Sequence, residues 1–278
     1  MDRPVLVTGA RGLLGSDLVV ALRQAYGEAR VICTDCQELD ITDRSQVSRW
    51  FQQVRPGVVV NAAAFTDVDG AETRREEASR LNALGPGNLA EACGSAGARL
   101  VHFGTDYVFD GTGHRPWAET DAPNPINHYG ATKLAGDLNV LAGPRNLVLR
   151  IQWLYGRRRD RFTALRGKDR FTPFCDQFGA PTWSRRVAAV VVELLNRDAA
   201  GLFHVAHDDH ASWAETYAFA CRELGLAVRL VPCRSSEVNL PAPRPLFGVM
   251  SNRKLVELLG QQVMGSWKDS LREFLRSV

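Results

Sequence analysis

The chain has 278 residues, of which 45% are apolar and 23% charged, so it can bury a full core as an ordinary globular protein. Its formal net charge of +3 is small and argues against general binding of nucleic acids. Six scattered cysteines indicate a reduced set without a disulfide framework, and the longest apolar run, at 187–192, is far shorter than a membrane span. We therefore expect a cytoplasmic protein that binds neither nucleic acid nor a membrane.

The first half of the chain alternates apolar strands with amphipathic helices. Residues 4–7 predict a strand, a glycine-rich turn follows, and a helix runs to about Tyr26. Further strands are expected at 31–34, 58–60, 100–103 and 147–151, and helices at 45–54 and 83–96. Continuous apolar strands that alternate with helices are typical of a parallel sheet covered on both faces. The pattern predicts an α/β fold with a Rossmann-type, doubly wound parallel sheet.

The second half is less regular. A loop rich in proline and asparagine at 121–127 leads to a helix that carries Tyr129 and Lys133. After it we expect a helix at 185–195, a strand at 201–206, an irregular proline-rich segment, and helices at 254–259 and 267–275. The predicted organisation is a dinucleotide-binding domain and a smaller substrate-binding lobe over the carboxyl edge of its sheet. The domain would comprise residues 1–151 and 184–208, and the lobe residues 152–183 and 209–278.

The glycine-rich turn between the first strand and helix indicates a dinucleotide site. It reads Gly9-Ala10-Arg11-Gly12-Leu13-Leu14-Gly15, one residue wider than the common fingerprint. Glycines permit the tight turn and let backbone amides approach a pyrophosphate at the positive end of the helix. The alternative is a simple strand-to-helix turn.

Two residues bear on the choice between NAD and NADP. Asp35 follows Gly15 by 20 residues (35 − 15), at the end of the second strand, where a carboxylate would bind ribose hydroxyls and favour NAD. Arg11 lies inside the glycine turn and would pair with a 2′-phosphate, which favours NADP. We expect either cofactor, with a slight preference for NADPH.

Tyr129 and Lys133 are four residues apart on the predicted helix, so both side chains project from one face. A cation beside a phenol favours the ionised form and lowers the pKa of the tyrosine. The pair then serves as an acid or base nearer neutral pH. A solvated lysine beside a half-buried tyrosine is the alternative.

Three other clusters suggest ligands. Cys33 and Cys36 have the spacing of half a zinc site, but no second pair follows. His204, His207 and His210 recur every third residue, and we interpret them as one strand histidine and two surface ones. We therefore expect no metal. The arginines at 157–161 either clamp a diphosphate or solvate a loop.

Several motifs in order carry a family resemblance. They are the glycine turn, 39–43 (LDITD), 61–64 (NAAA), 105–111 (TDYVFDG), Tyr129-x-x-x-Lys133, and Asp176-Gln177-x-Gly179-x-Pro181-Thr182. Together they resemble the extended short-chain dehydrogenase/reductases, and among these the dTDP-4-dehydrorhamnose reductase family. The resemblance covers nearly the whole chain.

The resemblance implies roles for individual residues. Tyr129 would donate a proton to a ketone oxygen, Lys133 would lower the tyrosine pKa and hold the nicotinamide ribose, and Thr105 would bind the reacting oxygen. The expected substrate contacts are Thr105, Asp106, Tyr107 and Trp153. The expected cofactor contacts are Gly9, Arg11, Gly12, Leu13, Leu14, Asp35, Asp40, Ile41, Ala62, Ala63, Ala64, Asn82, Tyr129 and Lys133. Of these, Asp40 and Ile41 would cradle adenine, and Asn82 would support the loop after the third strand.

The chain departs from the family pattern in the expected lobe. Where relatives usually have Thr-Ser-Trp, it reads Ile151-Gln152-Trp153, and the arginine-rich segment 157–161 replaces a Gly-x-Asn-Phe element before a helix that looks shortened. We therefore expect an NAD(P)H-dependent reductase of the 4-keto group of a nucleotide-activated deoxysugar, with dTDP-4-dehydrorhamnose as the best guess. The alternatives are a regulatory subunit like the methionine adenosyltransferase β subunit and a sugar-nucleotide epimerase. The class is compatible with a homodimer.

Overall fold

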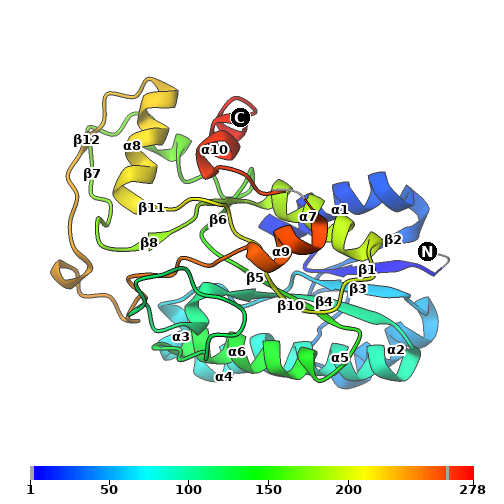
Figure 1. The fold of residues 1–278 in the computed structure, drawn as a ribbon. Coiled ribbons are helices and arrows are strands. Elements are labelled where there is room, and N and C mark those ends of the chain that lie inside the picture. Colours follow the sequence, from blue (N-terminus) through cyan, green and yellow to red (C-terminus); the bar gives the residue numbers. More distant parts are fainter. Residues whose placement is uncertain (1–2, 261–262) are drawn as a thin grey trace.

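A computed structural model describes residues 3–260 and 263–278, and its centre is a six-stranded sheet (Figure 1). The strand order is β10-β5-β4-β3-β1-β2, and every neighbouring pair is parallel. The strands are β1 (Val5–Thr8), β2 (Val31–Thr34), β3 (Val58–Asn61), β4 (Arg99–Thr105), β5 (Leu147–Ile151) and β10 (Gly201–His204). The predicted doubly wound sheet is confirmed.

Helices cover both faces of this sheet (Figure 1). On one face α1 (Leu13–Tyr26), α7 (Ser184–Asn196) and α9 (Arg253–Leu259) contribute to one apolar cluster with the strands. On the other face lie α2 (Arg44–Val54), α5 (Gly85–Ala96) and α6 (His128–Leu141). Because both faces are covered, the strands are mostly apolar on both faces rather than alternating between apolar and polar residues.

The strand order reverses beside β1. The chain goes from β1 to β2 on one side and then places β3 on the other side of β1. In open α/β sheets, ligands bind in the crevice at the carboxyl ends of the strands at such a reversal. The glycine turn after β1 and the Asn61-Ala62-Ala63-Ala64 run, which begins at the last residue of β3, both lie at this edge.

A second, smaller cluster packs around α8 (Trp213–Leu224) and α10 (Trp267–Leu275). Its short strands form two-residue pairs: β6 (Leu154–Tyr155) with β9 (Thr182–Trp183), β8 (Phe178–Gly179) with β11 (Ala211–Ser212), and β7 (Arg170–Phe171) with β12 (Arg229–Leu230). Leu255 and Leu259 of α9, in contrast, pack against the large sheet. The proposed division of the chain into a domain and a lobe stays a prediction.

Short helical elements complete the fold. They are α3 (Gly70–Thr73), α4 (Arg75–Ser79), a π-helical turn (Arg80–Leu84) that runs into α5, and 3₁₀ turns at Glu28–Arg30, Asp106–Val108, Thr163–Leu165 and Ser235–Glu237. The helix expected at 83–96 therefore begins at Gly85, after the π-helical turn. None of the helices within the described ranges is long and apolar enough to cross a membrane.

Candidate active site

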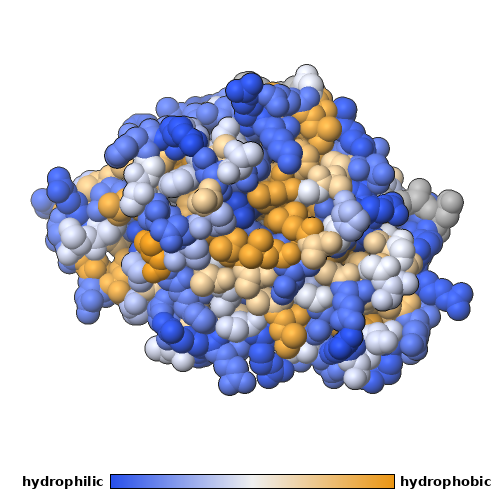
Figure 2. All heavy atoms as spheres, turned by 60° about the horizontal axis from the view of Figure 1, so that its bottom comes forward, coloured by the Kyte–Doolittle hydropathy of each residue, from blue (hydrophilic) through white to orange (hydrophobic). Residues whose placement is uncertain are grey.

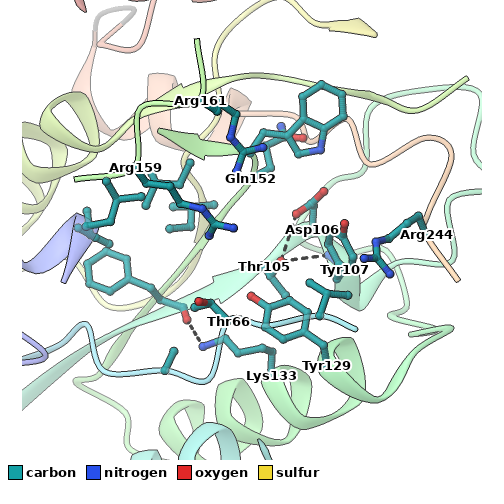
Figure 3. A pocket seen from close by; sticks show the side chains of 18 of the residues that line it. Thr66, Thr105, Asp106, Tyr107, Tyr129, Lys133, Gln152, Arg159, Arg161 and Arg244 are labelled. Atoms are coloured by element: carbon teal, nitrogen blue, oxygen red, sulfur yellow. Dashed lines mark hydrogen bonds between the residues drawn. The ribbon is translucent and has the colours of Figure 1, made fainter. Parts of the chain in front are cut away.

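A cavity of about 570 Å³ opens at the carboxyl edge of the sheet, between the sheet and the cluster around α8. Twelve of the residues predicted to be catalytic or to contact cofactor or substrate line it. These are Gly12, Leu13, Leu14, Ala62, Ala63, Ala64, Thr105, Asp106, Tyr107, Tyr129, Lys133 and Trp153. The structure thus brings the glycine turn, the end of β4 and the face of α6 together around one space (Figure 3).

The glycine turn is shaped to receive a phosphate group. Gly9 has a positive φ of 65°, and a Cβ there would lie 2.6 Å from the backbone nitrogen of Ala63. Gly12 is the N-cap of α1 and supplies no side-chain hydrogen bond to the first turn. The amides at this helix end therefore remain open toward the cavity, as a pyrophosphate would require. The residues fit a dinucleotide.

Arg11 and Asp35 lie outside the cavity and pair with each other. Arg11 Nε is 3.0 Å from Asp35 Oδ2, and the backbone nitrogen of Arg11 donates to the same oxygen at 2.9 Å. Arg11 Nη2 also contacts Glu38 Oε1 at 2.5 Å. The two residues that favour different cofactors thus hold one another at the rim, with the Arg11 side chain 58% exposed.

The other predicted cofactor residues also lie outside the cavity. Asp40 accepts a hydrogen bond from the backbone nitrogen of Thr42 at 2.8 Å, and Ile41 is buried against Gly85 of α5. Buried Asn82, in the π-helical turn, accepts from the nitrogen of Phe65 at 2.9 Å and donates to its carbonyl at 3.0 Å. Asn82 therefore holds the loop that follows β3.

Tyr129 points its hydroxyl into the cavity beside Thr105 (Figure 3). Although the ring is partly exposed, loss of solvation raises the pKa of the hydroxyl above its ordinary value, and hydrogen bonding to Thr105 opposes the shift. The Tyr107 ring packs edge-on against it, with centroids 5.5 Å apart. A phenol in this state keeps its proton at neutral pH and can donate it.

Lys133 lies one turn further along α6, and its Nζ donates to the carbonyl of Phe103 at 2.5 Å (Figure 3). Burial lowers the pKa of Lys133 to about 8, and Asp137 opposes that shift. Burial is the largest influence on the pKa of the Tyr129 phenol, so the net shift is upward, and the expectation that Lys133 lowers this pKa stays a prediction.

Asp106 is a buried carboxyl in the same wall. Its Oδ1 accepts a hydrogen bond from Thr105 Oγ1 at 3.1 Å, and burial raises its pKa to about 7. Near neutral pH the group is therefore divided between its acid and its carboxylate form. The acid form can donate a hydrogen bond to a ligand in the cavity.

Aromatic and basic side chains form the opposite wall. Trp153, with a positive φ of 45°, stacks on Trp213 at the start of α8, with centroids 3.9 Å apart. The Arg161 guanidinium lies 4.9 Å from the centroid of the Trp213 ring, and Arg159 also lines the cavity (Figure 3). The arginine-rich segment is thus divided, because Arg157 instead donates to the carbonyl of Ser277 at 3.1 Å.

Sequence reasoning missed several residues of this wall. Trp213, Gln152, Gln177 and Arg244 line the cavity but were assigned no role. Arg244 makes two hydrogen bonds to Asp69, Nη1 to Oδ1 at 2.9 Å and Nη2 to Oδ2 at 2.8 Å. The capping-box spacing of Ser212 and Glu215 was the available signal that α8 begins at Trp213.

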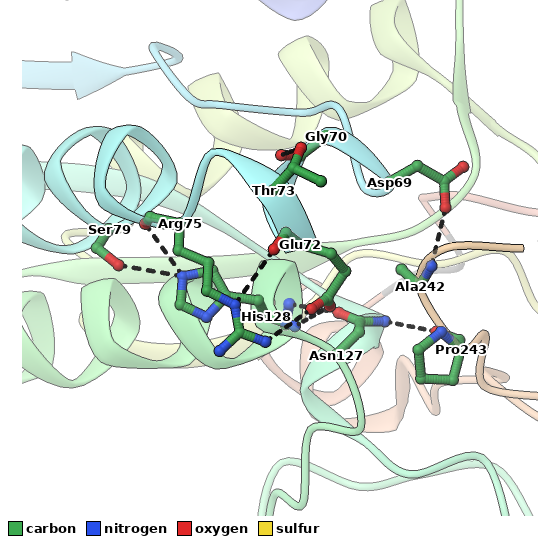
Figure 4. A network of polar contacts seen from close by, with 11 residues as sticks. Asp69, Gly70, Glu72, Thr73, Arg75, Ser79, Asn127, His128, Ala242 and Pro243 are labelled. Carbon is green, nitrogen blue, oxygen red and sulfur yellow. Dashed lines mark hydrogen bonds and ion pairs between the residues drawn. The ribbon is translucent and has the colours of Figure 1, made fainter.

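A polar network holds the start of α6 (Figure 4). Asn127 caps the helix by accepting from the nitrogen of Gly130 at 2.7 Å, and its Nδ2 donates to the carbonyl of Pro243 at 2.9 Å. Glu72 accepts from the nitrogen of His128 at 2.7 Å. The helix end that presents Tyr129 is therefore tied both to α3 and to the C-terminal part of the chain.

The clusters that suggested metals are built differently. Within 3–260 and 263–278, no group of three or more histidine, cysteine, aspartate and glutamate side chains could hold a metal ion. His204 and His207 are both buried. The expectation that His207 lies at the surface is wrong, because its Nδ1 contacts the carbonyl of Met264 at 2.9 Å beneath a returning segment.

Comparison with known proteins agrees with this geometry. A family model described as the RmlD substrate binding domain matches residues 3–278. The chain is 34% identical to the spore coat polysaccharide biosynthesis protein SpsK of Bacillus subtilis, over 98% of this chain and 96% of that one. It is 37% identical to a dTDP-4-dehydrorhamnose reductase of Burkholderia thailandensis, over 92% and 93% of the two chains.

Solved structures of dTDP-4-dehydrorhamnose reductases are also similar to this chain in fold and sequence. A dTDP-4-dehydrorhamnose reductase of Clostridium acetobutylicum superposes with a TM-score of 0.93 at 36% identity, over 99% of both chains. The corresponding enzyme of Bacillus anthracis, in complex with NADP, gives 0.93 at 31% identity over 100% of both chains. The chain therefore belongs to the RmlD family of nucleotide-sugar 4-keto reductases, which includes the dTDP-4-dehydrorhamnose reductases.

Proposed function

We propose that this protein is an NADPH-dependent reductase of the 4-keto group of a nucleotide-activated deoxysugar, with dTDP-4-dehydrorhamnose as the first substrate to test. The observation that carries the proposal is the convergence of Thr105, Tyr129 and Lys133 on one cavity beside an open glycine turn. The family relationship gives the reaction class. Relatives as similar as the dTDP-4-keto-6-deoxy-D-glucose reductase of Streptomyces niveus, at 37% identity, leave the sugar as the open part of the proposal.

When bound, a nicotinamide cofactor would supply the hydride for the carbonyl carbon. Tyr129 then donates its phenolic proton to the carbonyl oxygen, and Thr105 turns its hydroxyl proton from Asp106 to the same oxygen and stabilises its developing charge. A raised pKa suits this role, because the phenol stays protonated until the oxygen becomes basic. Lys133 places a cation next to the phenolate that remains.

The opposite wall would bind the rest of the substrate. Arg159 and Arg161 line the cavity and would contact a diphosphate, since Arg244 is already paired with Asp69. The Trp153 ring and the hydroxyl of Tyr107 would contact the sugar, and Asp106 would donate to one of its oxygens.

The test of the proposed function is Tyr129→Phe. We expect turnover to fall by about 10²- to 10⁴-fold while the Kd for NADPH stays within about twofold, because only proton donation is lost. NADPH oxidation with a panel of nucleotide 4-keto sugars measures the first quantity, and quenching of protein fluorescence the second. Tyr155→Phe is the matched control, since Tyr155 is fully buried outside the cavity and its hydroxyl has no hydrogen-bond partner among the described residues.

The same assay separates the alternatives. A wild-type protein that oxidises no NADPH with any 4-keto sugar favours the regulatory subunit. Interconversion of a nucleotide sugar without net NADPH consumption favours the epimerase. Turnover of Tyr129→Phe close to that of the wild type contradicts the role of the phenol.

We further propose self-association and a cytoplasmic location. Leu138 of α6 is 60% exposed and Leu84, directly before α5, is 49% exposed. Helices α5 and α6 lie at the bottom of Figure 1, and this side is turned forward in Figure 2. Apolar side chains gather near the middle of the face that Figure 2 shows. Sedimentation velocity of Leu138→Glu against Val20→Glu, 55% exposed on α1, tests a homodimer through this face.

All six cysteines carry free thiols, which supports a reducing compartment.

A further inference from the structure

A line of buried ionisable groups lies directly behind Lys133, outside the residues used by the proposed reaction. Asp137 follows Lys133 by one turn of α6, so Tyr129, Lys133 and Asp137 lie along one helix face. His102 of β4 and Arg150 of β5 face this line from the sheet. The exposed fractions of His102, Asp137 and Arg150 are 1%, 0% and 3%.

The contacts join these groups to the lysine. Lys133 Nζ lies 3.5 Å from His102 Nε2, and His102 Nε2 lies 3.9 Å from Asp137 Oδ1. Arg150 Nε donates to the other carboxylate oxygen, Asp137 Oδ2, at 3.0 Å. Asp137 Oδ1 makes no hydrogen bond to any described residue. The carboxylate therefore has one oxygen turned toward the imidazole and the lysine.

A glycine in the middle of the sheet makes room for this arrangement. A Cβ on Gly104 of β4 would lie 2.6 Å from Asp137 Oδ1 and 2.9 Å from Arg150 Cγ. Any side chain at this position would displace the ion pair. The strand thus leaves space for the carboxylate at the place where β4 passes α6.

The hydrogen bonds around Asn61 fix the tautomer of His102. Asn61 Oδ1 accepts from Thr8 Oγ1 at 2.7 Å and from the nitrogen of Ala63 at 3.2 Å. Asn61 Nδ2 is therefore the atom that faces His102 Nδ1, at 3.2 Å, and it donates to that nitrogen. Burial and the neighbouring Lys133 hold the pKa of His102 well below its usual range, so the ring is neutral. Its single proton is on Nε2, which points toward Lys133.

His102 and Asp137 act on the ionisation of Lys133 in opposite senses. An Nε2–H group cannot accept a hydrogen bond from an ammonium, but it can donate to the lone pair of a neutral amine. It therefore favours the uncharged lysine. The Asp137 carboxylate favours the charged lysine by electrostatic attraction. Arg150 forms an ion pair with the same carboxylate. Tyr129 on the same helix face is neutral and adds no charge.

We propose that His102 and Asp137 are positioning residues that balance the charged and neutral forms of Lys133 from behind the active site. The carbonyl of Phe103 accepts one hydrogen bond from Lys133 Nζ, and we expect the remaining N–H groups of the ammonium to point away from the imidazole into the cavity. The importance of Lys133 itself rests on the proposed function. The balance is a property of the protein without cofactor and can be measured without turnover.

The chain offers a direct measurement because it contains four lysines, Lys133, Lys168, Lys254 and Lys268. The other three are exposed, so Lys133 is the buried member of the set. In protein labelled with ¹³C at lysine Cε, Lys133→Arg assigns the fourth signal. We expect Lys133 to titrate about two pH units below the ordinary lysine value of about 10.4 in the wild type, in line with its pKa of about 8.

Two substitutions of His102 form a matched pair. Gln reaches the position of Nε2 and retains an N–H donor toward Lys133, whereas Asn reaches only the position of Nδ1 and retains the contact with Asn61. We expect His102→Asn to raise the titration midpoint of Lys133 by about one pH unit and His102→Gln to leave it nearly unchanged. Asp137→Asn should lower the midpoint, but it leaves Arg150 buried without a counter-charge, so this variant is used only if it folds.

The outcomes separate the proposals. Equal shifts in His102→Asn and His102→Gln, or no shift in either folded variant, overturn the role of the Nε2 proton. In active enzyme, the upper limb of the pH profile of kcat should move with the lysine midpoint in His102→Asn, which a purely structural role would not cause. A wild type with the expected lysine titration but no reductase activity overturns the proposed function and leaves this inference standing.

Discussion

Arg11 and Asp35 form the contact at the rim on which we expect cofactor preference to depend. Their mutual pairing means that a 2′-phosphate must compete with Asp35 and Glu38 for the guanidinium. We expect Asp35→Ala to raise the ratio of kcat/KM for NADPH over NADH severalfold, because it frees Arg11 and removes a negative charge. Arg11→Ala should lower the same ratio. Steady-state kinetics with both cofactors measures it, and movement in the same direction for both variants would contradict the assignment.

Asp106 gives a prediction about stability and pH. Its folded-state pKa of about 7 lies above the unfolded value of about 3.9, so the folded protein binds this proton more tightly. The carboxyl therefore lowers the free energy of unfolding progressively as the pH rises from about 4 to 7, and the loss persists above 7.

Asp106→Asn keeps an acceptor for Thr105 and has no charge to bury. We expect this variant to be more stable than the wild type at pH 8 and to differ little at pH 4. Urea unfolding across this range measures the difference. A variant less stable than the wild type at pH 8 would show that the carboxylate is favourably bound there.

At the residue scale, the sequence predicts pairs that are close along the chain and misses those that are not. Tyr129 and Lys133 are one helical turn apart, so their common face follows from spacing alone. Asp137 continues the same spacing, but its partners His102 and Arg150 come from two strands, and no local pattern joins them. Arg244 and Asp69 are 175 residues apart and meet only through the fold.

At the scale of secondary-structure elements, the segment that carries Arg244 is joined beside the cavity to the distant segment that carries Asp69. The Arg244 side chain is 13% exposed and makes a two-point contact with Asp69. We expect Arg244→Ala to lower the free energy of unfolding by about 1–3 kcal/mol, because a charged partner of a hydrogen-bonded pair is lost, and to raise the KM for the sugar nucleotide. Arg253→Ala is the control, since its side chain is 85% exposed in a pair along α9 and should change stability by less than about 0.5 kcal/mol.

The effect of Arg244→Ala should depend on pH. The hydrogen bond from Arg244 lowers the pKa of Asp69, so this contribution is present above the unfolded value of about 3.9 and is lost as the pH falls below it. The difference between wild type and variant should therefore be largest near neutral pH. A difference that is constant down to pH 3 would show that packing, and not the ion pair, is responsible.

The elements that were predicted and those that were missed differ in length and regularity. The six strands of the large sheet and the helices at 185–195, 254–259 and 267–275 follow from runs of apolar residues, and the structure confirms them within a few residues. The two-residue strands of the second cluster are too short to show any period. Helix α8 was missed because the aromatic residues at its start were not connected with the cap formed by Ser212.

At the scale of the whole molecule, the predicted domain and lobe are interwoven. The chain passes between them at 151–152, 183–184 and 208–209. Leu255 and Leu259 of α9 pack with α1 and α7 on the large sheet, although the sequence assigned this stretch to the lobe. The cavity takes side chains from both parts. Neither part is one continuous segment, so we expect neither to fold independently of the other.

We therefore expect the whole chain to unfold in one transition, with equal calorimetric and van't Hoff enthalpies, despite its two apolar clusters. NADPH at about 100 times its Kd should stabilise the folded state by about 2.7 kcal/mol and raise the Tm of this single transition by about 5 °C. Differential scanning calorimetry with and without NADPH makes the measurement. Tyr129→Phe should retain the full shift, because the phenol acts on the substrate. The contrary outcome is two transitions, of which only one shifts its Tm with NADPH. It would show that the substrate-binding lobe is an independent folding unit, and that α9 and the Arg244–Asp69 contact couple this lobe only weakly to the sheet.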